Sequence, residues 1–379
     1  MKLFDVYPLQ PVTPVKGEGS YLIDDQGERY LDLYGGHAVI SIGHGNQRYG
    51  QAIAEQAADL TFYSNSVINP LQHELATKLG ELSGYEDYNL FLVNSGAEAI
   101  ENGVKLASFY NGRKKVVALT RGFHGRTSLA ASVTQGSKMT APVNENHQVE
   151  FVEINDLDGL EAVLKNEDVS SVIIEGIQGI AGIYEPTAAY LEGVEKLCRK
   201  YGTLLILDEI QSGYGRSGKF FAHQYSNVQP DLITIAKGMA NGFPAGGVLI
   251  HPKIEAKYGL LGTTFGGTHL ICRAGIAVLD ILKEDQLIEN AAVVGEYLKS
   301  RLVQEFPDAE VRGRGLMIGI EFSEPIKAAR QALLNEFHIF TGVANNPNVL
   351  RLLPPLCLTK EEADYFVESL KSVYQKVLA

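Results

Sequence analysis

Residues 232–247 read Leu-Ile-Thr-Ile-Ala-Lys-Gly-Met-Ala-Asn-Gly-Phe-Pro-Ala-Gly-Gly, an apolar run that ends before Lys237 and passes into glycine-rich sequence. A short apolar run bounded by glycines is typical of a buried strand. A lysine at the mouth of such a strand is costly to bury unless its amine is used or paired, and lysine amines form Schiff bases with carbonyl compounds. Most lysines are simply exposed, so the interpretation of Lys237 depends on the rest of the chain.

The overall composition narrows the class of protein. The 379 residues exceed what one hydrophobic core usually serves, so two domains are expected. A net charge of −12 argues against nucleic acid as a partner. The N-terminus lacks the apolar stretch of a signal peptide, and no apolar run is long enough to span a bilayer. We therefore expect a cytoplasmic protein with no membrane partner.

The three cysteines, Cys198, Cys272 and Cys357, are far apart in the sequence. Their spacing matches neither a metal site nor a redox motif. We expect reduced core residues and no metal site.

The middle of the chain alternates short apolar runs with helical patterns. The expected strands are Leu90–Val93, Val116–Thr120, Phe151–Ile154, Val172–Ile174, Leu204–Leu207, Leu232–Ala236 and Gly247–Ile250. A helix is expected over Ala188–Tyr201, with Gly202 as its stop. This alternation predicts an α/β fold with a mainly parallel sheet, whose ligand site lies beyond the carboxyl ends of the strands. Residues 56–275 are expected to form this large domain, and residues 1–55 and 276–379 a smaller α+β domain.

Polar residues follow several of these strands. Ser95 suits the N-cap of a helix, Glu98 completes a capping-box pattern with it, and a helix start is a natural phosphate site. After the next strand, Phe123 offers an aromatic ring for stacking, and the guanidinium of Arg126 can bind a carboxylate with two hydrogen bonds. His124 is interpreted as structural. Each has an ordinary alternative: a plain cap, a core ring or a surface arginine.

Two acids occupy strand ends in the same way, Glu175 and Asp208, and Gln211 follows closely. An acid held there can pair with a protonated ring nitrogen, although a solvated strand-end acid is an equally ordinary interpretation. The run Gly213–Gly218 matches the dinucleotide pattern GxGxxG, but no helix pattern follows it, which argues against a nicotinamide oxidoreductase.

A phosphate site, a stacking ring, an acid for a ring nitrogen and a Schiff-base lysine are the groups that pyridoxal phosphate requires. The chain resembles the class III, fold-type I pyridoxal-phosphate aminotransferases, and within them the acetylornithine/ornithine group. The motifs that carry the resemblance are NSGAEA, GFHGRT, LLILDEIQSGYGRSG, ITIAKGMANGFPAGG, GTTFGG and RLLPPL.

This resemblance implies a role for each residue. Lys237 would hold the cofactor and move the proton, and Asp208 would pair with the ring nitrogen. The remaining cofactor contacts would come from Ser95, Gly96, Ala97, Phe123, Glu175 and Gln211, and from Thr264 of a neighbouring subunit. Arg126 and Arg351 would bind substrate carboxylates.

The implied reaction moves the terminal amine of an N-acylornithine, acetyl or succinyl, to 2-oxoglutarate in arginine biosynthesis, in a homodimer with its sites at the interface. Free ornithine or another class III donor such as 4-aminobutyrate remains an alternative, as does a cofactor-binding protein without turnover.

The chain departs from the family pattern at three places. Ile180 stands where relatives usually have a glutamate that pairs with the arginine matching Arg351, so either another acid such as Glu185 substitutes or Arg351 stays ready for a carboxylate. Thr268-His269 replaces a common Asn-Pro, and Asn46-Gln47 replaces a common His-Pro. We therefore hypothesise that this protein discriminates differently between terminal amines and α-amino acids.

Overall fold

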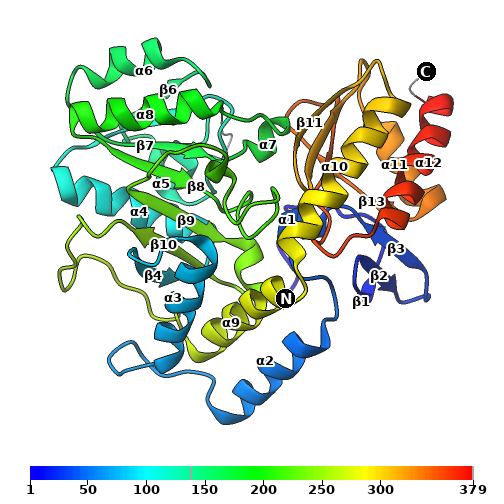
Figure 1. Cartoon of the computed structure of the whole chain (residues 1–379), viewed down its shortest axis with the longest axis horizontal. Coiled ribbons are helices and arrows are strands. Elements are labelled where there is room, and N and C mark those ends of the chain that lie inside the picture. The colour runs from blue at the N-terminus through cyan, green and yellow to red at the C-terminus, as the bar shows by residue number, and fades with distance from the viewer. Residues whose placement is uncertain (137–138, 378–379) are drawn as a thin grey trace.

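The protein is built around a twisted sheet of seven strands with helices on both faces, joined to a smaller unit that contains both ends of the chain (Figure 1). The structure, a computed structural model, describes residues 1–136 and 139–377. The predicted fold class, a mainly parallel α/β sheet with a smaller α+β unit, is confirmed.

The large sheet contains every strand that the sequence predicted in the middle of the chain. In spatial order its strands are β4 (Asn89–Val93), β10 (Gly246–Ile250), β9 (Leu232–Ala236), β8 (Leu204–Asp208), β7 (Val169–Glu175), β5 (Lys115–Leu119) and β6 (Val149–Val152). Pairing is parallel from β9 through β6, and β10 is antiparallel to both of its neighbours. The carboxyl ends of β5, β7, β8 and β9 therefore share one edge.

Helices cover both faces of this sheet (Figure 1). They are α4 (Gly96–Asn111) and α5 (Ser128–Ser132) on one face, and α6 (Leu157–Leu164) and α8 (Ala188–Tyr201) on the other. The strands accordingly bury both of their sides: in β8, Leu204 and Ile206 pack toward α4, whereas Leu205 and Leu207 pack toward α8. Two-sided burial explains why the sequence shows continuous apolar runs here rather than alternation.

The smaller unit contains two four-stranded sheets. One is formed by β1 (Pro14–Glu18), β2 (Tyr21–Asp24), β3 (Arg29–Asp32) and β13 (Ile339–Phe340), and the other by β11 (Glu310–Arg314), β12 (Met317–Glu321), β15 (Val349–Leu352) and β14 (Gly342–Val343). The parallel pairing of β3 with β13 joins the two ends of the chain.

The remaining helices link and cover these sheets. They are α1 (Gly35–Ala38), α2 (Gln47–Asp59), α3 (Pro70–Ser83), α7 (Gly179–Gly182), α9 (His269–Glu284), α10 (Leu287–Glu305), α11 (Lys327–Phe337), α12 (Lys360–Val377), and the 3-10 turns η1 (Pro142–Asn144), η2 (Ala222–Tyr225) and η3 (Lys237–Ala240). Within the described ranges, no helix is long and apolar enough to cross a membrane.

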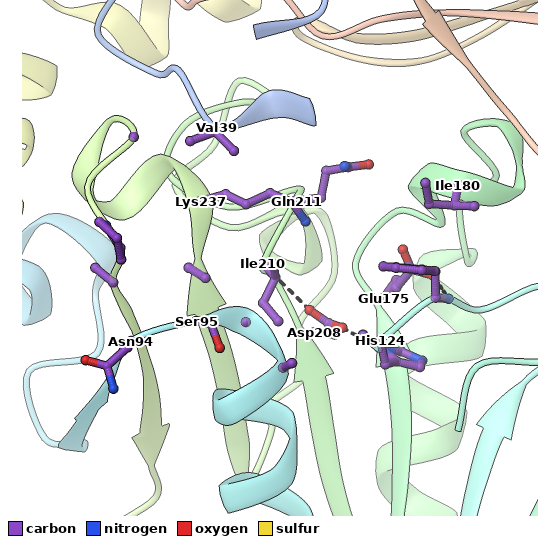
Figure 2. A pocket seen from close by; sticks show the side chains of 18 of the residues that line it. Val39, Asn94, Ser95, His124, Glu175, Ile180, Asp208, Ile210, Gln211 and Lys237 are labelled. Carbon is purple, nitrogen blue, oxygen red and sulfur yellow. Dashed lines mark hydrogen bonds and ion pairs between the residues drawn. The ribbon is translucent and has the colours of Figure 1, made fainter. Parts of the chain in front are cut away.

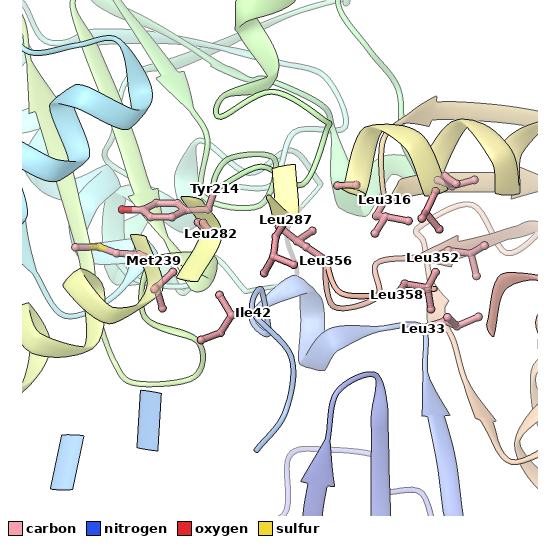
Figure 3. Packing of buried hydrophobic residues seen from close by; sticks show 14 of the residues in the cluster. Leu33, Ile42, Tyr214, Met239, Leu282, Leu287, Leu316, Leu352, Leu356 and Leu358 are labelled. Atoms are coloured by element: carbon pink, nitrogen blue, oxygen red, sulfur yellow. The ribbon is translucent and has the colours of Figure 1, made fainter. Parts of the chain in front are cut away.

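One hydrophobic cluster runs without interruption from the large sheet into the smaller unit. Figure 3 shows Tyr214 and Met239 on the large-sheet side and Leu316 and Leu352 on the other. The Gly213–Gly218 run lies at this junction and forms turns with no helix after it. A side chain at Gly215 would meet Ile288 of α10 at 2.7 Å, so this glycine is required for close packing and not for a dinucleotide.

Candidate active site

A cavity of about 300 Å³ opens at the carboxyl ends of the large sheet's strands. Its walls come from α4, the β5–α5 loop, β7, β8 with its following loop, and the Lys237 turn (Figure 2). The predicted site residues that line it are Ser95, Gly96, Ala97, Phe123, Glu175, Asp208, Gln211 and Lys237. Residues from five separate segments of sequence are therefore brought to one cavity.

The N-terminus of α4 forms one end of the cavity. The Ser95 hydroxyl caps the helix by accepting the Glu98 amide at 3.2 Å, but Glu98 Oε2 accepts the amide of Asn94 at 2.7 Å rather than that of Ser95. The predicted capping box is therefore only half formed. Among the described residues, the amides of Gly96 and Ala97 have no acceptor, so they are available to bind an anion.

Asp208, the last residue of β8, is buried in the cavity wall. Its Oδ2 is 2.7 Å from Nδ1 of His124, and its Oδ1 accepts the amide of Ile210 at 3.0 Å. Burial alone would lower the pKa of His124, but the hydrogen bond and charge of Asp208, with Glu175 nearby, raise it overall. The His124 ring thus holds the Asp208 carboxylate in place in the cavity wall.

Lys237 follows β9 directly and has a left-handed backbone, with φ of 45°. This conformation is costly for a residue other than glycine, and such strain clusters at functional sites. The Lys237 amine has no hydrogen-bond or ion-pair partner in the described part of the chain. Burial lowers its pKa, although the charges of Asp208 and Glu175 act in the opposite sense. A less basic amine is a better nucleophile and proton acceptor near neutral pH.

Glu175 ends β7, and its two oxygens accept the amides of Phe123 at 2.9 Å and Gly179 at 3.1 Å. Burial, opposed by His124, raises the pKa of Glu175 to about 7. The carboxyl group therefore joins the loop that carries Phe123 to the start of α7.

The remaining walls are apolar. Phe123, Ile210, Val39, Ile177 and Ile180 all line the cavity. Figure 2 shows Ile210 between Lys237 and Asp208 and Ile180 on the α7 side. Flat and aliphatic walls of this kind suit a planar ring.

Arg351 and Arg126 occupy different positions relative to the cavity. Arg351 is only 1% exposed and lies behind Gln211, whose Oε1 is 3.4 Å from Nη1 of Arg351. Arg126 is exposed, but its charge acts on His37, as do those of Lys237 and Arg351. Neither arginine lines the cavity itself, where Asp208 and Glu175, the two carboxylates among the described lining residues, already accept hydrogen bonds.

Two sequence-based expectations concern residues outside the cavity. Thr264 is exposed and does not line this cavity, so its contact with a second subunit stays a prediction. Glu185 accepts Nε of Arg314 at 2.6 Å and is not an ion-pair partner of Arg351. The absence of a glutamate at position 180 is therefore not compensated by Glu185.

Sequence reasoning missed two groups that matter in the site. His124 binds the Asp208 carboxylate, a contact beyond the structural role that the sequence suggests, and Ile210, which no motif singles out, lines the cavity. The one available signal was position: His124 sits between two motif residues, and Ile210 lies between Asp208 and Gln211.

Three groups in the cavity suit three parts of one ligand. The free amides of Gly96 and Ala97 suit a phosphate, the Asp208 carboxylate suits a protonated ring nitrogen, and the unpartnered Lys237 amine suits an aldehyde. These residues fit pyridoxal phosphate, the cofactor that the sequence predicted.

Comparison with known proteins agrees with this fit. Residues 6–374 match the family model of aminotransferase class-III. The chain is 40% identical to the acetylornithine aminotransferase of Archaeoglobus fulgidus over 97% of this chain and 96% of that protein. It is also 40% identical to acetylornithine aminotransferase 1 of Bordetella pertussis, over 100% and 98%. This chain belongs to the aminotransferase class-III family.

Solved structures show the same similarity. The ornithine aminotransferase of Toxoplasma gondii superimposes with a TM-score of 0.90 at 28% identity, over 98% of this chain and 92% of that chain. Another structure of that protein, with a TM-score of 0.89, 29% identity and the same coverage, has PLP at partial occupancy in its active site.

Proposed function

We propose that this protein is a pyridoxal-phosphate-dependent aminotransferase that moves the terminal amine of an N-acylornithine, acetyl or succinyl, to 2-oxoglutarate. The products are the corresponding semialdehyde and glutamate, as in arginine biosynthesis in the cytoplasm. The observation that carries the proposal is the unpartnered Lys237 amine, which shares one cavity with the Asp208 carboxylate and the free amides at the start of α4.

When bound, the cofactor supplies an aldehyde that exchanges amines and a protonated ring that takes up an electron pair. The chain's own groups make this chemistry possible. Asp208, held by His124 and by the Ile210 amide, keeps a proton on the ring nitrogen. Gly96 and Ala97 would bind the phosphate through their amides, and Phe123 and Ile210 would exclude water from the bound cofactor.

Lys237 moves the proton. With its pKa lowered by burial, the free amine accepts a proton from the donor carbon as a general base and returns it as a general acid. Gln211 supports the phenolic side of the ring, and Arg126 and Arg351 orient substrates through their carboxylates. Each role follows the family resemblance and is compatible with the position described above.

The donor is better explained as acylated than as free ornithine. A free ornithine would bring a second ammonium group into a site whose wall carboxylates already accept hydrogen bonds. Acylation removes that charge, whereas an unpaired buried charge is costly. The Toxoplasma gondii structures favour ornithine as the alternative donor, but at 28–29% identity, against 40% for acetylornithine aminotransferases.

The predicted homodimer is supported by an exposed apolar surface formed by the 60–68 segment and the loop that carries Thr264. Phe62 and Phe265, both exposed, lie with ring centroids 5.6 Å apart, and Asn65 donates to the carbonyl of Gly266 at 3.1 Å. Contiguous exposed apolar groups mark interaction sites. Sedimentation velocity of the purified protein tests this assembly, and a monomer at all concentrations would reject it.

A half-reaction screen tests the proposed function. Purified protein loaded with pyridoxal phosphate is mixed with acetylornithine, succinylornithine, ornithine or 4-aminobutyrate, and the absorbance of the cofactor is followed. We expect an acylated ornithine to bleach the absorbance fastest and 2-oxoglutarate to restore it. A cofactor absorbance that no donor changes would contradict the proposal, and a faster reaction with ornithine would favour the alternative donor.

A further inference from the structure

Four polar residues next to the cavity form a closed ring of contacts. Tyr34 Oη is 2.6 Å from Nδ1 of His37 and 3.5 Å from Nη2 of Arg351. Gln211 closes the ring, because its Oε1 is 3.4 Å from Nη1 of Arg351 and its Nε2 donates to the carbonyl of His37 at 3.3 Å. The ring joins the N-terminal segment, the β8 loop and β15, and it contains no carboxylate.

The acids nearest to this ring are engaged elsewhere. Glu175 acts on Arg351 electrostatically, but its oxygens accept the amides of Phe123 and Gly179. Asp32 acts on Tyr34, but it accepts the amides of Tyr34 and Gly35 and pairs with His44 at 2.8 Å. Among the described residues, the acceptors that hold the buried Arg351 cation are therefore all neutral: the Val343 carbonyl, Gln211 and Tyr34.

The direction of the hydrogen bonds around Tyr34 follows from these partners. Arg351 can only donate, so the Tyr34 oxygen accepts from Nη2 and its hydroxyl proton is free to reach Nδ1 of His37. Partial burial, with the charges of Arg351, Lys237 and Arg126, lowers the pKa of His37. The imidazole is thus neutral near pH 7, and its Nδ1 can accept.

The backbone that carries this pair is strained. Gly35, Gly36, His37 and Ala38 are all left-handed, with φ of 54°, 55°, 70° and 65°. His37 and Ala38 are not glycine, and a left-handed residue of that kind costs about 1–2 kcal/mol. The Gly35 carbonyl accepts hydrogen bonds from the amides of Val39 and Ile40, at 2.8 and 2.9 Å, and these bonds hold the turn in place. Strain that persists beside a binding cavity points to a functional placement of the His37 ring.

We propose that Tyr34 and His37 are positioning residues for Arg351. As a neutral hydrogen-bonded pair they keep its guanidinium in place without a carboxylate, so that the α-carboxylate of the keto acid meets a cation with no anion to displace. The contacts at 3.4 and 3.5 Å are long for N–H···O bonds, so Nη1 and Nη2 keep donor capacity for a charged carboxylate while Tyr34 and Gln211 hold the guanidinium in place. The inference rests on the proposed function, because it takes Arg351 as the site of that carboxylate.

The test measures carboxylate binding separately from turnover. Glutarate, a dicarboxylate with no keto group, is titrated into the holoenzyme by calorimetry. Tyr34→Phe removes the hydroxyl and keeps the ring, and we expect glutarate affinity to fall about fivefold, as for one lost hydrogen bond. Tyr365→Phe is the matched control, because that hydroxyl donates to the Phe337 carbonyl outside this ring, and it should leave the affinity unchanged.

Variants at His37 separate positioning from general stability. His37→Ala should weaken glutarate binding about as much as Tyr34→Phe, whereas His37→Asn, whose amide oxygen can accept from Tyr34, should restore most of it. The donor half-reaction with acetylornithine should change less than twofold in all three variants, because by the proposed roles that donor uses Arg126. In the 2-oxoglutarate half-reaction, KM should rise and the limiting rate should stay.

Several results would overturn this inference. They are an unchanged glutarate affinity in both Tyr34→Phe and His37→Ala, the same loss in His37→Asn as in His37→Ala, an equal loss in both half-reactions, or no glutarate binding by the unaltered protein. A holoenzyme that binds glutarate but transfers no amine would instead reject the proposed function, and the binding differences among the variants would still decide the role of the pair.

Discussion

Two buried arginines, one at the junction of the two units and one beside the cavity, have opposite surroundings. Arg216 is 2% exposed and donates to the carbonyls of Leu316 at 3.1 Å, Pro354 at 2.6 Å and Ile40 at 3.2 Å. Arg351 is 1% exposed but has one carbonyl and two long contacts. Neither forms a salt bridge with a described acid. A buried cation with satisfied hydrogen bonds serves the structure, whereas one with spare donors is prepared for a ligand.

Lys237 belongs with Arg351 in this comparison, because its amine has no hydrogen-bond partner among the described residues and so, like Arg351, has donors to spare. Burial lowers the pKa of Arg216 to about 10, so it stays charged at neutral pH. Burial lowers the pKa of Lys237 as well, but there the consequence is chemical, since an amine can lose its proton and a guanidinium does not.

The largest effect is expected at the unpartnered amine. Lys237→Ala removes the Schiff-base nitrogen and the proton carrier, so covalent attachment of the cofactor should be lost and the amine-transfer rate should fall by about 10²–10⁴ or more. The absorbance of the reconstituted protein and single-turnover rates measure both. An unaltered absorbance in this variant would show that Lys237 is not the attachment site.

The two arginines should respond oppositely to the same substitution. Arg216→Met leaves three carbonyls without this donor, those of Leu316, Pro354 and the partly buried Ile40, so urea unfolding should show a loss of about 3 kcal/mol or more. Arg351→Met should keep the stability within about 1 kcal/mol and raise the 2-oxoglutarate KM at least about 100-fold. Similar stability losses in both variants would remove the distinction between a structural and a ligand-binding cation.

A carboxylate introduced into the cavity should pair with Arg351, which would then resemble Arg216 in having its hydrogen bonds satisfied. Ile180 lines the cavity, and its carbonyl accepts the amide of Asn345 at 2.8 Å, close to the Val343 carbonyl that binds Arg351. Ile180→Glu should pair with the arginine and compete with substrate carboxylates, so rates with glutamate should fall about tenfold relative to acetylornithine. Steady-state rates with both donors, against Ile180→Gln as control, measure the ratio. An unchanged ratio would reject the hypothesis that Ile180 alters donor discrimination.

The smallest effect concerns an acid rather than a cation. The pKa of Glu175 is raised to about 7, so its contribution to stability is present at low pH and is lost as pH rises from the unfolded value, about 4.3, through 7. Glu175→Gln removes this dependence, and its stability relative to the unaltered protein should improve between pH 5 and pH 8. Urea unfolding at both values measures the difference. If the stability difference between Glu175→Gln and the unaltered protein were the same at pH 5 and pH 8, the raised pKa of Glu175 would be contradicted.

Much of the large sheet could be predicted because each strand is specified by residues that are neighbours in the sequence. Each of the seven strands contains a short, largely apolar run, and the predicted helix Ala188–Tyr201 is confirmed with a left-handed Gly202 after it. Parallel strands have their carboxyl ends at one edge of the sheet. The residues that follow these strands, Ser95, Phe123, Glu175, Asp208 and Lys237, were therefore expected to meet in one site. Even so, the Glu98 carboxylate binds a different amide from the one that the capping box predicted.

The sequence by itself determined the fold class and the cavity-lining residues at the strand ends, Lys237 among them, because each depends on short patterns in which neighbours along the chain fix the structure. Only the tertiary structure decided which buried cation is satisfied. Arg216 finds its carbonyls on segments 100, 138 and 176 residues away, and the Tyr34–Arg351 contact spans 317 residues. Hydrogen bonds between such distant segments depend on how the two units pack, and no local pattern records that packing.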